Sequence, residues 1–380
     1  MNFSLSEEQL MVSNAAREFA LTELKPGVIK RDELQEFPDN LVKKMGALGF
    51  MGIMVEPKYG GSGMDSISYV LIMEELSKID ASASVIVSVN NSLVCYGLQK
   101  YGSEKQKEKF LPKLASGEFV GAFCLSEPEA GSDATSQQTS AIDCGDHYLI
   151  NGTKNWITSG GRSDVYIVIA QTDRSKGAKG INAFIIEKEM DGFEIGPKED
   201  KLGIRGSDTH TLQFNDVKVP KENRIGENGF GFKFAMKTLS GGRIGIAAQA
   251  LGIASGAYEL ALNYSKQRKA FGTQICNHQA IAFKLADMAT DIEAARHMVM
   301  KAAWEKDQGI NYDTSSAMAK LFASRIAMKH TVEAVQIHGG NGFVKDYHVE
   351  RLMRDAKITQ IYEGTSEIQK MVISRSILKN

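Results

Sequence analysis

One carboxylate in an apolar setting is the first residue of this sequence that could do acid–base chemistry. Glu363 lies in Ile361-Tyr362-Glu363-Gly364-Thr365-Ser366-Glu367, just before a segment that we expect to be helical. A helix N-terminus favours a carboxylate anion, whereas burial favours the neutral acid and raises its pKa. A carboxylate held between these tendencies is suited to removing a proton from a substrate. Taken alone, the segment also fits a helix-start acid that only interacts with the helix dipole, which is the commoner case.

Three further segments combine glycine or small hydroxyl side chains with apolar residues. Phe123–Asp133 leaves an expected strand and enters a loop whose backbone N–H groups could contact an anionic or carbonyl-bearing ligand. Trp156-Ile157-Thr158-Ser159 offers an indole face and hydroxyl groups to a heteroaromatic ring. Gln336–Gly342 has three glycines where backbone and ligand could approach closely. Each segment has a structural alternative: a capped surface loop, a core tryptophan on a strand, and a helix C-terminal cap.

Several common catalytic motifs are missing from the sequence. It has no phosphate-binding P-loop, no G-x-G-x-x-G after an expected strand, no H-E-x-x-H zinc motif and no G-x-S-x-G nucleophile elbow. His338 and His348 fit ordinary polar positions better than metal ligands. The cysteines are far apart and form no C-x-x-C, so we expect reduced thiols and no metal site.

Composition and charge exclude several classes of protein. The 380 residues include 45 lysine and arginine against 46 aspartate and glutamate, a net charge of −1. This balance argues against a nucleic-acid binder, for which a basic domain is expected. The sequence has no run of about 18 apolar residues, so we expect no membrane insertion. The N-terminus, Met1–Glu8, has acids where a signal or transit peptide would have bases, and we expect a cytoplasmic protein.

The elements that must position these segments follow from periodicity and turn residues. The first part has capping boxes at Ser6-x-x-Gln9 and Ser103-x-x-Gln106, with helical spacing between them. Short β-branched and aromatic runs follow, with Asn151-Gly152 in a hairpin position, and these predict an antiparallel β-domain. The expected division is helical, β and helical, at residues 1–118, 119–225 and 226–380.

The last 160 residues contain no proline, which favours long helices in the last part. Apolar residues from Ile281 to Ala302 recur at alternating intervals of four and three residues, which predicts an apolar seam along one face of a helix. Asp313 is expected to cap the next helix, and Ser366-x-x-Gln369 fits the capping box of a last helix. Together these features predict a helix bundle. The apolar residues expected along the helix that follows Asp313 are Met318, Leu321, Met328, Val332 and Val335.

Taken together and in this order, the segments resemble the acyl-CoA dehydrogenase family of flavoenzymes. Leu125-Ser126-Glu127 through Gly131-Ser132-Asp133 is similar to the family's first signature. Gln336-x-x-Gly339-Gly340-x-Gly342-Phe343 is similar to the second, and Asp346, Arg351 and Asp355 follow at matching spacings. The resemblance covers the whole chain. It implies an α+β multidomain fold with an N-terminal helical domain, a middle antiparallel β-barrel-like domain and a C-terminal four-helix bundle.

The resemblance implies FAD as cofactor, an acyl-CoA thioester as substrate and no metal. Thr158 would hydrogen-bond near flavin N5, and Arg268 with Gln279 would bind the ADP half of FAD. In this family a neighbouring subunit shares that half and the Gln336–Gly340 loop. The implied flavin-contacting residues are Phe123, Leu125, Ser126, Gly131, Ser132, Trp156, Ile157, Thr158, Arg268, Phe271, Gln279, Gln336, Ile337, Gly339, Gly340, Thr365, Ser366 and Glu367. The implied substrate-contacting residues are Ser132, Ser240, Arg243, Gln249, Thr359 and Gly364, although many relatives have Asp in place of Ser240.

The resemblance also implies a mechanism in which Glu363 is the base. Glu363 would remove the α-proton while the β-hydride passes to flavin N5, giving a trans-2-enoyl-CoA. The backbone N–H of Glu363 and a ribityl hydroxyl would stabilise the thioester oxygen. Isovaleryl- and long-chain-type members carry a Glu base at the position of Gly242, which is a glycine here. The family's usual partner is electron-transfer flavoprotein, and the expected assembly is a homotetramer built as a dimer of dimers.

Gln249 and Thr359 favour a short straight-chain substrate near C4, because short-chain members have these residue types at the matching positions. We expect a polar, bulky pocket floor to shorten the cavity, since a methylene buried against an unsatisfied amide loses the usual gain of about 0.8 kcal/mol. The alternatives are a medium- or branched-chain dehydrogenase and an acyl-CoA oxidase, although oxidases are usually much longer. Nitroalkane oxidases carry Asp at the base position. A non-catalytic helical scaffold would not need Glu363, Thr158 and Arg268 together.

Overall fold

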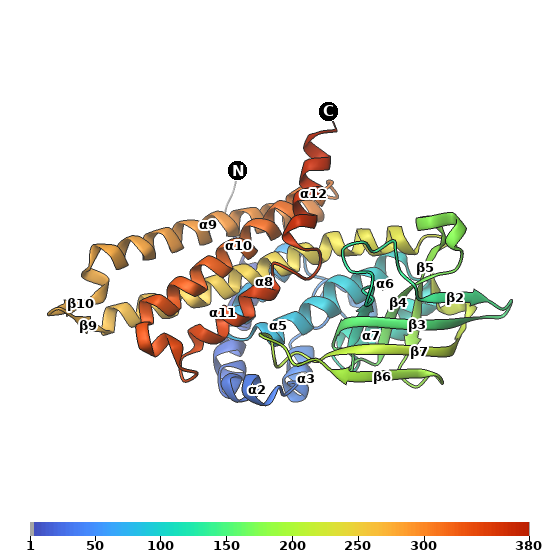
Figure 1. Cartoon of the computed structure of the whole chain (residues 1–380), viewed down its shortest axis with the longest axis horizontal. Helices are drawn as coiled ribbons and strands as arrows, with labels where there is room; N and C mark the ends of the chain where they lie inside the picture. The colour runs from blue at the N-terminus through green and yellow to red at the C-terminus, as the bar shows by residue number, and fades with distance from the viewer. Residues whose placement is uncertain (1–3, 380) are drawn as a thin grey trace.

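Helices form both ends of the chain and a β-sheet lies between them, which confirms the expected order (Figure 1). The computed structural model describes residues 4–379, so Met1–Phe3 and Asn380, at the outer ends of the first and last expected domains, lie outside it. In Figure 1 the sheet occupies one end of the molecule, and the long C-terminal helices run from beside it to the opposite end.

The N-terminal part is helical as predicted. Ser6 and Ser103 complete both expected capping boxes, because their hydroxyls accept the N–H groups of Gln9 and Gln106 at 3.1 and 3.3 Å. The elements are α1 (Glu7–Phe19), η1 (Ala20–Leu24), α2 (Val28–Leu34), α3 (Asp39–Ala47), η2 (Pro57–Tyr59), α4 (Ser66–Ile79), α5 (Ala81–Ser88), η3 (Val89–Cys95), α6 (Tyr96–Tyr101) and α7 (Glu104–Ala115).

The middle part is one eight-stranded sheet in the order β6-β7-β3-β2-β4-β5-β8, with β1 paired to β4. Most pairs are antiparallel as expected, but β1 and β2 each pair with β4 in parallel, which the turn pattern did not predict. The sequence runs predicted to form strands also did not include β2, β6 or the short β8. The strands are β1 (Gly121–Cys124), β2 (Ser140–Asp143), β3 (His147–Thr158), β4 (Val165–Gln171), β5 (Ile181–Glu187), β6 (Phe193–Lys198), β7 (Thr209–Pro220) and β8 (Arg224–Ile225), with η4 (Arg174–Gly180) and η5 (Lys221–Asn223) between them.

The hairpin predicted at Asn151-Gly152 is wrong. Both residues lie inside β3, where the pairing register with β7 shifts between Ile150 and Gly152. Gly152 has a φ of 144°, and a Cβ there would lie 2.6 Å from the Thr139 hydroxyl oxygen. Gly152 therefore allows an irregularity in the pairing of a long strand. A glycine within a strand often marks such an irregularity, and it does not require a turn.

The continuous apolar runs of β4 and β5 arise because these strands have two buried faces. Val165, Ile167 and Ile169 of β4 belong to the core shared with the helices, whereas Tyr166 and Val168 belong to a second core on the other face of the sheet. Side chains alternate between the faces of a strand, so a strand covered on both sides loses the apolar–polar alternation.

The C-terminal part is helical as predicted, and α8 alone spans 37 residues. Of the residues predicted to form the seam of α9, Leu285 to Ala302 are buried. The elements are α8 (Gly231–Gln267), β9 (Lys269–Ala270), β10 (Thr273–Gln274), η6 (Ile275–Asn277), α9 (Gln279–Asp307), α10 (Asp313–His338), η7 (Gly339–Phe343), α11 (His348–Ile358) and α12 (Ser366–Ile377).

The helix predicted after Asp313 is confirmed as α10, but its predicted apolar residues differ in burial: Met328 and Val335 pack against the core. The helix buries a stripe of mainly small residues that includes Ala317, Lys320 and Ala323, whereas Met318 and Val332 are exposed. Small residues face inward because α8, which packs on α10, is itself rich in buried glycine and alanine and allows close approach.

Two predicted helix caps are also corrected. Asp313 is the first residue of α10 and not its cap, which is Tyr312. Thr365, and not Ser366, caps α12 by accepting the Ile368 N–H at 3.4 Å.

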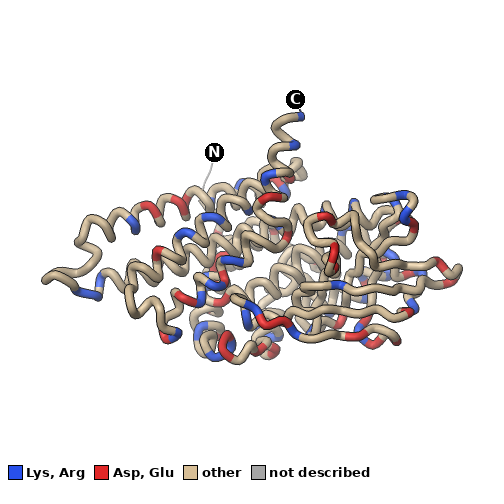
Figure 2. Tube along the Cα trace, viewed as in Figure 1, with Lys and Arg blue, Asp and Glu red and all other residues tan. Residues whose placement is uncertain are grey.

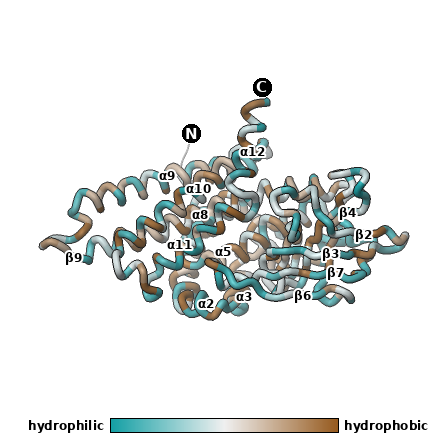
Figure 3. Tube along the Cα trace, viewed as in Figure 1, coloured by the Kyte–Doolittle hydropathy of each residue, from teal (hydrophilic) through white to brown (hydrophobic). Residues whose placement is uncertain are grey.

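Two helical stretches, Ala81–Tyr101 and Gly231–Gln267, are long and apolar enough to cross a membrane by composition. Their apolar windows are 94% and 83% buried within the protein, which is the behaviour of core helices. Hydrophobic residues recur along both in Figure 3. Charges of both signs are interspersed along the chain (Figure 2), consistent with its net charge of −1.

Candidate active site

Glu363 lies in a short turn between α11 and α12. Its φ is 51° and that of Gly364 is 95°, so two successive residues have left-handed backbone conformations. Such a conformation costs about 1 kcal/mol or more for a non-glycine residue and persists only where the surroundings hold it. The turn is held by Gln369, which donates to the Gly364 carbonyl at 2.8 Å and to the Glu363 carbonyl at 3.3 Å. Lys320 donates to the Gly364 carbonyl at 2.6 Å.

The Glu363 side chain points at Gly242 on α8. A Cβ on Gly242 would lie 2.0 Å from Glu363 Oε2 and 2.8 Å from Leu93 Cδ2, so the carboxylate occupies the space that a side chain at 242 would need. Glu363 Oε2 is buried and has no hydrogen-bond partner among residues 4–379. A buried, unpaired carboxylate oxygen in a native structure calls for an explanation, and a role in accepting a proton from a ligand supplies one.

The charges around Glu363 set its protonation. Burial raises the pKa of Glu363 to about 7, against the opposing effect of the positive charges of Lys320 and Arg243. Burial also lowers the pKa of Lys320 to about 7 and lowers the pKa of Arg243. The guanidinium Nε of Arg243 is buried without a partner in the described structure. A carboxylate whose pKa lies near neutral pH is matched to general base catalysis.

A hydrogen-bonded cluster extends from the residue before the base to the first helices. Tyr362 donates its hydroxyl proton to Gln249 Oε1. Gln249 in turn donates to the Ala81 carbonyl at 2.9 Å and is 3.1 Å from the Ser84 hydroxyl. Its amide is therefore satisfied, which corrects the expectation of an unsatisfied amide at the pocket floor. Thr359 is also buried and satisfied, because its hydroxyl donates to the Ala356 carbonyl at 2.7 Å.

Tyr69 is a neighbour of this cluster that sequence reasoning missed. A Cβ on Gly245, one helical turn beyond Gly242, would lie 2.2 Å from the Tyr69 hydroxyl. Tyr69 is buried and its hydroxyl is 3.1 Å from that of Ser88. Side chains from three other parts of the chain therefore cover the face of α8 that carries Gly242 and Gly245. They are Leu93, Tyr69 and Glu363.

The first predicted flavin-contacting segment lies at the sheet. Phe123 stacks on Phe234 of α8 with ring centroids 6.3 Å apart. Phe234 precedes Gly242 by eight residues, which is about 12 Å along a helix. Glu127 anchors the loop after β1 through a buried ion pair with Lys154 at 2.7 Å, and Lys154 also donates to the Leu125 carbonyl at 3.0 Å. Leu125 and Ser126 are half-buried, whereas Gly131 and Ser132 are exposed.

The second segment is joined to the first. The Ser126 carbonyl accepts the Asn155 N–H at 2.8 Å. Trp156 is 61% exposed and has a φ of 61°, Ile157 is buried and Thr158 is half-buried. Asp208 stabilises the turn that follows β3, because its carboxylate accepts a hydrogen bond from the Gly161 N–H at 2.8 Å. An exposed indole with a strained backbone is typical of a binding surface.

The ADP-side residues lie elsewhere. Arg268, Phe271 and Gln279 surround the β9–β10 hairpin, which Figure 1 places at the opposite end of the molecule from the sheet. Gln336–Gly340 ends α10 near the same place, since His338 stacks on Tyr264 of α8 with centroids 4.2 Å apart. Ile337 is buried, Gln336, Gly339 and Gly340 are exposed, and the Phe271 ring is 97% exposed. One chain therefore does not bring the two halves of the predicted flavin site together.

The remaining predicted residues lie near Glu363. Thr365 and Ser366 are half-buried at the start of α12, and Glu367 is exposed. Ser240 and Arg243 are buried on α8, where the Ser240 hydroxyl donates to the Met236 carbonyl at 3.2 Å. Sequence reasoning missed Lys320, although a lysine within a stripe of alanine and serine at helical spacing was an available signal.

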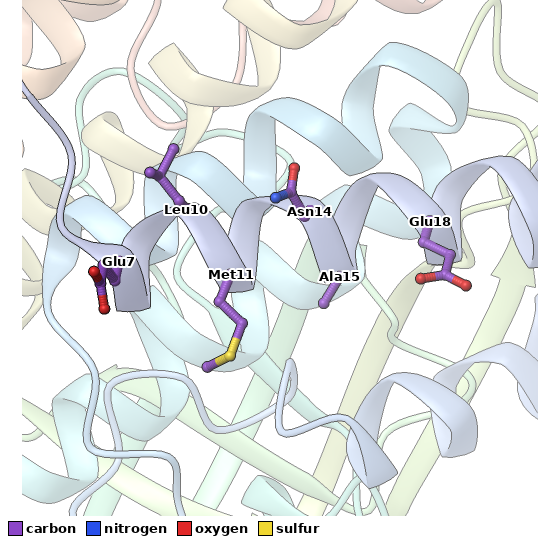
Figure 4. A pocket seen from close by; sticks show the side chains of 6 residues that line it. All are labelled: Glu7, Leu10, Met11, Asn14, Ala15 and Glu18. Carbon is purple, nitrogen blue, oxygen red and sulfur yellow. The ribbon is translucent and has the colours of Figure 1, made fainter.

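Other candidate sites receive no support. The open hollow in Figure 4 lies on one face of α1, and none of the predicted site residues lines it. Its lining residues are Glu7, Leu10, Met11, Asn14, Ala15 and Glu18. Within residues 4–379 no group of three or more histidine, cysteine, aspartate or glutamate side chains is arranged to hold a metal ion.

Comparisons with known proteins identify the family and the fold of the chain. Models of the acyl-CoA dehydrogenase N-terminal, middle and C-terminal domains match residues 6–118, 122–217 and 229–378. The chain is 53% identical over 379 residues to the short-chain specific acyl-CoA dehydrogenase of Clostridium acetobutylicum, covering 100% of both chains. It matches the structure of butyryl-CoA dehydrogenase from Megasphaera elsdenii with a TM-score of 0.98 and 50% identity over all of both chains. A chain in a structure of the electron transferring flavoprotein of Acidaminococcus fermentans matches with a TM-score of 0.99 and 51% identity, again over all of both chains.

Proposed function

The chain belongs to the acyl-CoA dehydrogenase family, and on that premise we propose that it dehydrogenates a short-chain acyl-CoA thioester to a trans-2-enoyl-CoA with Glu363 as the base. The observation that carries the proposal is the Glu363 carboxylate itself. The residue is half-buried, but its Oε2 atom is buried, unpaired and directed at a glycine, and desolvation raises its pKa to about 7. These are the properties of a base that awaits a substrate proton.

The protein residues bind, orient and move one proton. Glu363 Oε2 takes the α-proton as the α-carbon–hydrogen bond breaks, and the Glu363 backbone N–H donates to the thioester carbonyl, where negative charge develops. Lys320 and Arg243 favour the ionised carboxylate before the transfer. Bound FAD would supply the acceptor for the β-hydride. The surrounding side chains of Leu93, Tyr69 and Tyr362 limit the entry of water.

The chain's own residues fit FAD. An added Cβ at Gly131 or Gly340 would meet nothing within 4 Å, so packing within the chain does not explain these glycines. A ligand that lies against the backbone does explain them. The exposed rings of Trp156 and Phe271 offer flat apolar faces, and Arg268 is exposed without an ion-pair partner in the described structure. We assign the flavin-contacting roles given above to these segments.

A shared site follows from the separation of the two groups. One chain holds the proposed flavin-ring residues and the proposed ADP-side residues at opposite ends (Figure 1), which supports a site completed by a neighbouring subunit. We propose a homotetramer, a dimer of dimers. Large apolar side chains exposed on the C-terminal helices, such as Phe283, Trp304 and Val332, support such contacts.

Three further proposals complete the assignment. Short chain length is supported by the relatives and by the buried Gln249–Tyr362 cluster next to the base, which acts by filling space. Electron-transfer flavoprotein is the proposed electron acceptor, supported by the similarity to a chain in a structure of such a flavoprotein. We retain residues 1–118, 119–225 and 226–380 as the proposed domains and the cytoplasm as the proposed location.

Two measurements test the proposal. Glu363→Gln keeps the shape of the base but cannot accept the proton, so turnover should fall by about 10²–10⁴-fold while FAD stays bound. Near-normal turnover would contradict the assignment. In the native enzyme, kcat/KM with butyryl-, hexanoyl-, octanoyl- and isobutyryl-CoA should be highest for butyryl-CoA. A maximum at octanoyl-CoA would refute the short pocket, and one at isobutyryl-CoA would indicate a branched-chain enzyme.

A further inference from the structure

A fully buried lysine lies beside the turn that carries the base. Lys320 on α10 is 0% exposed, and its ammonium group donates to the Gly364 carbonyl at 2.6 Å. No carboxylate lies within ion-pair distance of it among residues 4–379, and the carboxylates whose charges act on it are Glu363 and Glu367. A buried ammonium group costs several kcal/mol unless it is compensated. Its neighbours on the same helix face, such as Ala317 and Ala323, show that packing alone does not demand a lysine here.

The contact made by Lys320 falls on a strained part of the backbone. Glu363 and Gly364 both have positive φ, and their carbonyls accept from two buried side chains, Lys320 and Gln369. Gln369 is neutral and also buried. Both side chains can fix the turn, but only Lys320 brings a charge to it.

We propose that Lys320 is a positioning residue for the reaction: it fixes the Glu363–Gly364 turn through the Gly364 carbonyl and supplies the positive charge that keeps the Glu363 carboxylate ionised inside the site. The proposal rests on the proposed role of Glu363. Lys320 differs from Arg243, the other cation that acts on Glu363, because it is bonded to the turn itself. Arg243 lies on α8, where the negative charge of Asp313 also acts on it.

The other titratable groups do not replace this charge. Tyr362 and Tyr69 act on Glu363 only as neutral groups at working pH, because burial raises the pKa of each phenol. Glu367 faces Lys320 from α12 and adds negative charge. Two cations, Lys320 and Arg243, act on the Glu363 carboxylate. Without Lys320, Arg243 would be the one that remains of this pair.

Three variants of the flavin-loaded enzyme separate charge from hydrogen bond. Lys320→Met removes both, Lys320→Gln keeps a donor without the charge, and Lys320→Arg keeps both. The readout is the acid limb of kcat/KM for butyryl-CoA against pH. We expect the limb to move up by at least about one pH unit in Lys320→Met and Lys320→Gln, as loss of a nearby opposite charge does. Lys320→Arg should stay close to the native enzyme.

A second readout needs no turnover. The infrared band of the protonated Glu363 carboxyl, isolated by difference from Glu363→Gln, should titrate at higher pH in Lys320→Gln than in the native enzyme. Lys329→Met is the matched control, because Lys329 lies on the same helix but is exposed and paired with Asp291 at 2.9 Å. It should leave both readouts unchanged.

An acid limb that does not move in Lys320→Met or Lys320→Gln would overturn the proposal. So would a shift in Lys320→Met alone, since the charge would then be dispensable. If Lys320→Met does not assemble, the Lys320→Gln and Lys320→Arg pair decides. Failure of the underlying function is distinct, because Glu363→Gln would then remain active whatever the Lys320 variants show.

Discussion

Glu363→Gln should make the protein more stable at neutral pH while it lowers turnover. In the folded protein the pKa of Glu363 is about 7, against an ordinary value of 4.5. A folded pKa above the unfolded one means that the group's contribution to stability is fully present below pH 4.5 and is lost as pH rises through 7. The difference of 2.5 corresponds to about 3 kcal/mol above pH 7. Glutamine avoids this cost, but Lys320 then loses its anionic neighbour, so we expect a net gain of about 1–2 kcal/mol.

The assay measures the thermal unfolding midpoint of the flavin-loaded protein between pH 4.5 and 8. Unfolding is monitored by flavin fluorescence. For a chain of this size a gain of 1–2 kcal/mol raises the midpoint by roughly 1–3 °C. The difference between variant and native protein should be near zero at pH 4.5 and should grow through pH 7. Glu108→Gln, an exposed glutamate on α7, is the control and should show no such trend. If Glu363→Gln is less stable than the native protein at pH 8, the argument that burial of the ionised carboxylate destabilises the native protein is refuted.

Two further predictions concern the site. Gly242→Ala places a Cβ 2.0 Å from Glu363 Oε2, so the base must move, and kcat/KM should fall by at least about tenfold with FAD retained; Gly241→Ala, whose Cβ would meet nothing closer than 3.9 Å, should lose much less, and equal losses would contradict the steric argument. Arg268→Ala should lose FAD and weaken the tetramer, as measured by flavin absorbance and sedimentation. Arg268→Lys should rescue little, because lysine lacks the bidentate geometry for a pyrophosphate; a fully flavinated tetrameric Arg268→Ala would show that Arg268 is only a surface cation.

Most elements could be predicted because their signals are local. The Ser6 and Ser103 capping boxes, the buried runs of β4 and β5 and the seam of α9 each depend on residues within a few positions of one another. Asn151-Gly152 misled because the same dipeptide serves a turn or an irregularity within a strand, and only the pairing with β7 and the contact with Thr139 distinguish them. Met318 and Val332, predicted among the apolar residues of α10, are exposed because small residues of α8 and α10 form the contact between these helices.

The sequence by itself determined the family, the order of the elements and the identity of the candidate base, because motif spacing and periodicity are written in contiguous residues. The tertiary structure decided what surrounds that base. Lys320 reaches Gly364 across 44 residues and Tyr362 reaches Gln249 across 113, and no local pattern reports either contact. The close approach of α8 and α10 through small residues places Gly242 and Lys320 near Glu363. Burial there, and not residue type, raises the pKa of the carboxylate, since desolvation depends on the whole packed environment.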